Sequence, residues 1–295
     1  MKIFLSSVLL SAAAVSAFAQ PTAVELLEQK TLERIRAVNT SLNGVLGFHA
    51  IDLTTGHTLF LNSGTIFPQA SSIKIAIMIQ MFKSARAGAF NLTGPVTLDP
   101  GETVAGSGHL QILLRTGPVT MTVRDLIGAM IETSDNTAAN RCISMVGIER
   151  VNRTLEEMGF RATRLQRRML DTAAAAKDQE NIGTPQEMAH LVDLIYHGKA
   201  VDAEASKEML VMMQRVNADM RKVIPASIAV AAKPGDLTGV KCETGIVFLP
   251  NRPFALSVAS TFLDEGRNPV GEVTRIVYEH FEKLAGSNKF GNKLQ

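Results

Sequence analysis

The order of strand-like and helix-like segments most limits how this chain can fold. Alternating, strand-like patterns occur near both ends of the chain, in 44–61, 228–232, 240–249 and 254–262. Helical patterns fill most of 71–196 between them, and others flank the strands in 24–38, 206–215 and 268–284. We therefore expect an α/β protein of the α+β type, in which an antiparallel five-stranded sheet lies between N- and C-terminal helices and an all-helical lobe is inserted.

This arrangement predicts one compact unit with two lobes. We expect a sheet lobe formed by about 20–66 and 205–285, a helical lobe formed by about 67–204, and a cleft between them. A hydrophobic content of 46% is enough for a large core in a chain of 295 residues.

The first residues have the pattern of a secretory signal. Lys2 supplies the positive charge, 3–15 are apolar or small, and Ala17-Phe18-Ala19 matches the A-x-A cleavage pattern. We expect cleavage after Ala19 and export to the periplasm or the extracellular space; a retained anchor is the alternative. Because no cysteine precedes Cys142, the sequence excludes a lipid-anchored mature N-terminus.

Composition argues against several other classes of protein. A net charge of +2, a pI near 8.6 and the absence of tryptophan do not favour nucleic-acid binding. The six histidines lack metal-site spacing, so we expect no metal and no cofactor. Cys142 and Cys242 could form a disulfide in an oxidising compartment, but we favour two buried free thiols.

The most reactive pattern is Ser71-Ser72-Ile73-Lys74, which opens an apolar run predicted to be a buried helix. Residues three apart on a helix share one face, which would place the Ser71 hydroxyl beside the Lys74 amine. A serine needs an adjacent base to become a nucleophile, and a buried lysine can be that base. The alternative interpretation is that the serine caps the helix and the lysine in the next turn has no catalytic role.

Two more motifs follow in order. Ser134-Asp135-Asn136 comes just after the helical pattern at 126–131, and Lys233-Pro234-Gly235 comes at the end of a predicted strand. With S-x-x-K, this set resembles the active site of penicillin-recognising serine enzymes, most closely the class A β-lactamases. The resemblance covers nearly all of the chain after the signal, including Thr163-Arg164-Leu165 at the start of a long loop.

The resemblance implies a role for each matching residue. Ser71 would be the acylated nucleophile, activated by Lys74, and Ser134 would pass a proton to the leaving nitrogen. Asn136 would hold the substrate's acylamide carbonyl, and Lys233 would add a second positive charge near Ser134.

The same resemblance implies an oxyanion hole. It would consist of the backbone N–H of Ser71 and that of Asp236, the residue after Gly235. Asp135 would be structural.

The long loop departs from the family pattern. Aligned on Arg164-Leu165, Met169 takes the position of the glutamate that activates the deacylating water, and a methionine cannot accept a proton. Asp171 is the nearest carboxylate, and we expect it to be a loop or capping residue rather than a replacement base. The alignment also places Arg167 opposite Asn181, which predicts a neutral hydrogen bond where the family has an ion pair.

Pro234 is the second departure, because the family has threonine or serine there. Proline has neither the hydroxyl that helps bind a substrate carboxylate nor an N–H, so we expect it on the open edge of the sheet. Lys241 is a candidate source of compensating charge.

These observations predict an exported serine hydrolase, a monomer that acts on a β-lactam or acyl-peptide substrate through Ser71. One alternative is an esterase or D,D-peptidase-like hydrolase on the same scaffold. Another is a penicillin-binding sensor or scavenger that is acylated but deacylates poorly. We expect no nucleic-acid partner and no membrane anchor after signal cleavage.

Overall fold

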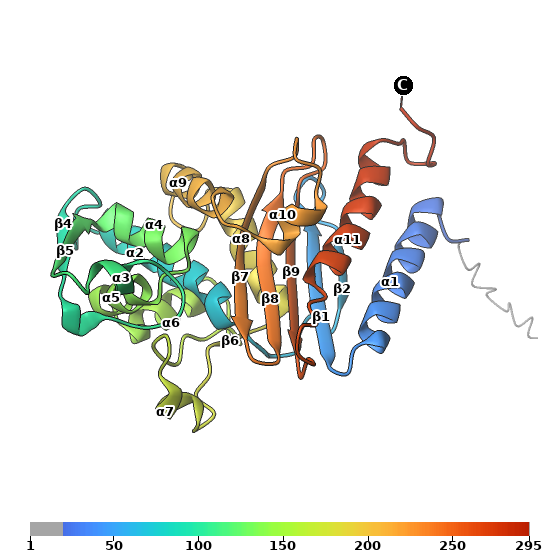
Figure 1. The fold of residues 1–295 in the computed structure, drawn as a ribbon. Coiled ribbons are helices and arrows are strands. Elements are labelled where there is room, and N and C mark those ends of the chain that lie inside the picture. Colours follow the sequence, from blue (N-terminus) through green and yellow to red (C-terminus); the bar gives the residue numbers. More distant parts are fainter. Residues whose placement is uncertain (1–19, 295) are drawn as a thin grey trace, which may run out of the picture.

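The computed structural model describes residues 20–294, so the predicted signal sequence, 1–19, lies outside the described residues. Its centre is an antiparallel five-stranded sheet with the strand order β2-β1-β9-β8-β7 (Figure 1). These strands are β1 (Val45–Asp52), β2 (Thr58–Leu61), β7 (Val230–Leu237), β8 (Val240–Val247) and β9 (Phe254–Thr261). The sheet therefore combines segments from both ends of the chain, as the sequence predicts.

Two helices cover one face of the sheet, and another covers the opposite face. The terminal helices α1 (Ala23–Ser41) and α11 (Val270–Ala285) pack side by side, whereas α8 (Pro185–Tyr196) packs on β1, β8 and β9 (Figure 1). Helix α1 begins at a capping box between Thr22 and Glu25.

The remaining helices lie mainly to one side of the sheet, except for the short helix at 219–223, which packs beside α11 (Figure 1). They are α2 (Lys74–Arg86), α3 (Leu110–Leu113), α4 (Val123–Glu132), α5 (Asn136–Val146), α6 (Ile148–Glu157), α7 (Thr172–Ala175), α9 (Ala203–Gln214) and α10 (Asp219–Val223). Helix α2 is buried over most of its length and contacts α4, α5 and α6, because its apolar run leaves no polar face. Among the helices of residues 20–294, none is both long and apolar enough to cross a membrane.

Short elements complete the fold around α2. The 3₁₀ turns η1 (Ala70–Ile73) and η2 (Pro100–Glu102) precede α2 and α3, respectively. Two small antiparallel pairs join β3 (Phe67–Pro68) to β6 (Ile182–Gly183) and β4 (Pro95–Leu98) to β5 (Val119–Thr122).

Strand β7 differs from its predicted bounds. The sequence pattern ends this strand before Lys233, but β7 continues through Pro234 and Gly235 to Leu237. Proline is tolerated there because β7 is an edge strand, which confirms the expected position of Pro234. Both cysteines are buried and unpaired, as predicted.

Candidate active site

Ser71 lies in the 3₁₀ turn η1, between the sheet and α2. The preceding residue, Ala70, has a left-handed φ of 44°, and this bend turns the chain into η1. The next hydroxyl, Ser72 Oγ, donates a hydrogen bond of 2.9 Å to the carbonyl of Lys233 on β7. Ser71 is therefore held on a rigid turn and remains partly exposed to solvent.

Lys74 is the first residue of α2 and is completely buried. Its Nζ lies 2.7 Å from the Ser134 carbonyl oxygen, 2.9 Å from Asn136 Oδ1 and 3.2 Å from Ser134 Oγ. Burial, and secondarily the charge of Lys233, holds the pKa of Lys74 well below its usual range. A neutral amine has two N–H groups for the carbonyl oxygens and keeps a lone pair for a hydroxyl proton.

Ser134 lies in the turn between α4 and α5, with a left-handed φ of 55°. Its Oγ also lies 2.9 Å from Lys233 Nζ, so both lysines converge on one hydroxyl. Lys233 is completely buried, and burial lowers its pKa to about 8. Asp135 caps α5 at Ala138 N and accepts from Leu110 N, which confirms its predicted structural role.

The Asn136 amide connects the lysine to the loop that precedes α3. Its Oδ1 accepts from Lys74, and its Nδ2 donates to the Ala105 carbonyl at 3.0 Å. An amide nitrogen has a second hydrogen, which remains for a ligand in the cleft.

Gly235 allows β7 to approach the Ser71 turn closely. A Cβ at this position would lie 2.5 Å from the Gln69 carbonyl oxygen and 2.6 Å from Cys242 Sγ, so no larger residue fits without movement. The next residue, Asp236, lines the same cavity as Ser71, and its carboxylate forms an ion pair with Lys241.

The cavity in front of Ser71 has a volume of about 150 Å³. Its walls come from η1, the loop before α3, the start of α5, the long loop and the end of β7. They are Ala70, Ser71, Gly106, Ser107, Asn136, Arg167, Met169, Leu170, Asn181, Asp236 and Leu237. Among these wall residues, Asp236 alone carries a carboxylate.

Met169 lines this cavity and is only 8% exposed. Asn140 holds its backbone on both sides, since Oδ1 accepts from Met169 N at 2.8 Å and Nδ2 donates to Met169 O at 3.1 Å. Asp171 instead caps α7 by accepting from Ala174 N at 2.9 Å. This confirms the expectation that Asp171 is a capping carboxylate.

The predicted partner of the Arg167 side chain is wrong. Its guanidinium forms a two-pronged ion pair with Glu180, with bonds of 3.0 and 2.9 Å, whereas Asn181 Oδ1 accepts from the backbone N–H groups of Gln166 and Arg167. The loop therefore keeps an ion pair, displaced by one residue. The sequence did contain a signal for this pair, because the acidic Glu180 directly precedes Asn181.

Leu170 and Asn140 are site residues that the sequence reasoning missed. Asn140 lies four residues after Asn136 of the Ser134-Asp135-Asn136 motif, and this nearness in sequence is the signal that could have found it. The sequence gives no such signal for Leu170, because nothing about a leucine in a loop indicates that its backbone has a left-handed conformation.

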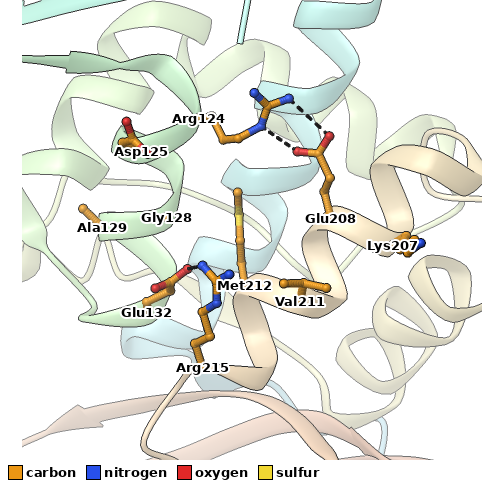
Figure 2. A pocket seen from close by; sticks show the side chains of 10 residues that line it. All are labelled: Arg124, Asp125, Gly128, Ala129, Glu132, Lys207, Glu208, Val211, Met212 and Arg215. Atoms are coloured by element: carbon orange, nitrogen blue, oxygen red, sulfur yellow. Dashed lines mark hydrogen bonds and ion pairs between the residues drawn. The ribbon is translucent and has the colours of Figure 1, made fainter. Parts of the chain in front are cut away.

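A second cavity, of about 480 Å³, lies between α4 and α9 (Figure 2). Ion pairs of Arg124 with Glu208 and of Arg215 with Glu132 cross it, and Met212 lies between these pairs (Figure 2). None of the predicted site residues lines this groove.

Comparison with known proteins agrees with this geometry. Residues 30–281 match the model of the β-lactamase enzyme family. The β-lactamase AST-1 of Nocardia asteroides is 26% identical over 257 residues, which cover 83% of this chain and 82% of that relative. The β-lactamase CARB-3 of Pseudomonas aeruginosa is 27% identical over 212 residues, which cover 70% of this chain and 73% of that relative. A crystal structure of a β-lactamase from Sphaerobacter thermophilus has 27% identity and a TM-score of 0.77, covering 86% of this chain and 97% of that one.

The fold and these matches define a serine β-lactamase-like hydrolase. The chain belongs to the β-lactamase enzyme family.

Proposed function

We propose that this protein is an exported hydrolase that β-lactams acylate at Ser71 and that releases the acyl group slowly. The convergence of Lys74 and Lys233 on the Ser134 hydroxyl is the observation that supports acylation. Lys74 follows Ser71 by three residues, and Ser71 lines the cavity together with Asn136. Export is inferred from the signal pattern that ends at Ala19.

In the acylation step, neutral Lys74 takes the Ser71 proton while Ser71 Oγ bonds to the lactam carbonyl carbon. The backbone N–H groups of Ser71 and Asp236 stabilise the negative oxygen, an interaction whose loss typically costs about 3–4 kcal/mol per donor. The carbon–nitrogen bond then breaks. Ser134 gives its proton to the departing nitrogen and regains one from Lys74, with which it already has a 3.2 Å contact.

Substrate binding uses the remaining polar groups of the cleft. The free N–H of Asn136 holds the acylamide carbonyl, and the buried ammonium of Lys233 attracts the substrate carboxylate. Pro234 contributes no hydroxyl, which weakens carboxylate recognition.

Slow release follows from the long loop. Deacylation needs a base that removes a proton from water, and Met169 cannot act as one. Asp171 is engaged as the cap of α7, and the Asp236 carboxylate is paired with Lys241. The acyl-enzyme therefore forms faster than water can attack it.

Intact mass after incubation with a penicillin tests the acylation. We expect an adduct of one penicillin on the wild-type chain, mapped to the peptide that contains Ser71. Ser71→Ala should show no adduct, whereas Ser287→Ala, at a partly exposed serine of the C-terminal segment, should react like wild type. Folded wild-type protein that neither gains mass nor consumes penicillin contradicts the proposal.

Pro234 favours a second candidate, an esterase or D,D-peptidase-like hydrolase, because recognition of a substrate carboxylate is reduced. Turnover of a chromogenic cephalosporin compared with that of short p-nitrophenyl esters separates the two. Faster turnover of the esters supports the second candidate.

A further inference from the structure

Leu170 has a backbone conformation that leucine rarely adopts. Its φ is 58°, in the left-handed region that favours glycine, and the residue is 45% exposed. A glycine would adopt this conformation without strain. Because Leu170 is so exposed, its side chain also gains little stability from packing. Neither backbone preference nor burial therefore explains a leucine at this position.

Both neighbours of Leu170 are fixed, so the strained conformation is maintained. Asn140 holds the Met169 backbone by two hydrogen bonds, and Asp171 caps α7. The Leu170 carbonyl also accepts from Thr172 N at 2.9 Å. Strained residues held in this way are concentrated at functional sites.

The side chain of Leu170 extends toward the opposite wall of the Ser71 cavity. A Cβ built on Gly106 would lie 3.5 Å from Leu170 Cδ1 and 3.0 Å from Asn136 Nδ2. The long loop and the loop before α3 therefore approach each other at Leu170 and Gly106. Gly106 itself has a φ of 88°, so a larger residue is disfavoured on that side too.

The whole cavity is small. Its volume of about 150 Å³ is below the roughly 300–1,000 Å³ of pockets for drug-sized ligands. Ala70, Met169 and Leu237 supply further apolar wall. The charged residues of the cavity wall are paired, Arg167 with Glu180 and Asp236 with Lys241.

We propose that Leu170 closes one end of the cleft and selects substrates with compact, uncharged acyl groups over bulky ones. The inference rests on the proposed acylation of Ser71 and names the substrate class of that site. Leu170 acts by excluding volume, without taking part in proton transfer.

The test compares the acylation rates of compact and bulky probes in matched variants. The probes are p-nitrophenyl acetate with p-nitrophenyl phenylacetate, and 6-aminopenicillanic acid with its phenylacetyl derivative. Leu170→Gly and Leu170→Ala should raise the bulky-to-compact rate ratio about tenfold. Leu26→Ala, at a leucine of α1 that is 44% exposed, should leave the ratio unchanged.

Two further results separate the possible failures. Leu170→Gly should melt no lower than wild type, because glycine relieves the left-handed strain, so a changed ratio cannot be ascribed to misfolding. If wild type is acylated and neither Leu170 variant changes the ratio, Leu170 is not a specificity residue. If no ester or lactam acylates wild type, the proposed function and this inference are both wrong.

Discussion

At the scale of single residues, two buried lysines share one serine hydroxyl. Lys74 and Lys233 both approach Ser134 Oγ, and burial lowers the pKa of each. Two adjacent ammonium groups repel each other, so the charge of Lys233 helps Lys74 to remain neutral. Ser134 Oγ therefore lies 3.2 Å from a lysine amine whose neutral form is favoured and 2.9 Å from a second lysine amine.

The pKa of about 8 at Lys233 predicts an alkaline limit to acylation by carboxylate-bearing lactams. A lysine is charged below its pKa, so the attraction for the carboxylate is present below pH 8 and declines above it. Lys233→Arg keeps its charge throughout this range and should move the decline to higher pH. The measurement is the acylation rate of wild type and Lys233→Arg from pH 6 to 10. If the rate declines with the same midpoint pH in both proteins, Lys233 is not the group that causes the decline.

Met169→Glu should supply the missing base. A positioned general base typically contributes about 10²–10⁴-fold, so deacylation should accelerate by about 100-fold or more while acylation changes little. The decay of the adduct mass measures this rate. Met169→Gln has nearly the same size without a carboxylate, and equal acceleration by both substitutions would show that space, not basicity, limits release.

Pro234→Thr should raise kcat/KM for carboxylate-bearing lactams, because it introduces a hydroxyl on β7 beside Lys233. Pro234→Val is the matched control, since valine has the shape of threonine without the hydroxyl. The two variants differ only in that group. A value for Pro234→Thr no higher than for Pro234→Val would show that β7 does not bind the carboxylate.

At the scale of elements, glycine has opposite roles in α4 and in β8. Gly128 lies inside α4 beside the groove of Figure 2, and a Cβ there would meet only Glu132 Oε1, at 3.6 Å. In β8, a Cβ on Gly245 would lie 2.5 Å from the Ala231 carbonyl oxygen. Only the second glycine is required by packing.

Gly128→Ala should therefore increase the free energy of unfolding by about 0.5–1 kcal/mol, the helix-propensity difference between the two residues. Gly245→Ala should lower it, because the backbone must move. Denaturant titrations of both variants and wild type provide the comparison. Destabilisation by Gly128→Ala would mean that the open groove itself contributes to the native fold.

Elements with a local pattern could be predicted from the sequence, whereas features that depend on tertiary context could not. The hairpin of β1 and β2, the terminal helices and the three motifs carry such local patterns. The sequence pattern ends β7 too early because Pro234 and Gly235 normally interrupt strands, and only its position at the sheet edge permits both. The acidic Glu180 is visible in the sequence, but which of Glu180 and Asn181 meets the Arg167 side chain depends on loop geometry, which a single sequence does not specify.

At the scale of the whole molecule, residues far apart in sequence meet in one cleft. Ser71 and Lys74 come from the segment after the first hairpin, Ser134 and Asn136 from the α4–α5 turn, and Lys233 from β7. The sheet, built from both chain ends, holds β7 against η1, while buried α2 carries Lys74 into contact with α5. The fold thereby brings together the groups to which we assign acylation, and in the proposed function the long loop around Met169 limits the release of the acyl group.

Time-resolved intact mass of the protein with a penicillin tests acylation and release together. We predict that a one-to-one adduct on Ser71 accumulates to near completion and then decays much more slowly than it formed. Rapid hydrolysis of many equivalents of penicillin without an accumulated adduct would contradict the assigned role of Met169. Folded wild-type protein that shows neither an adduct nor hydrolysis would contradict acylation at Ser71.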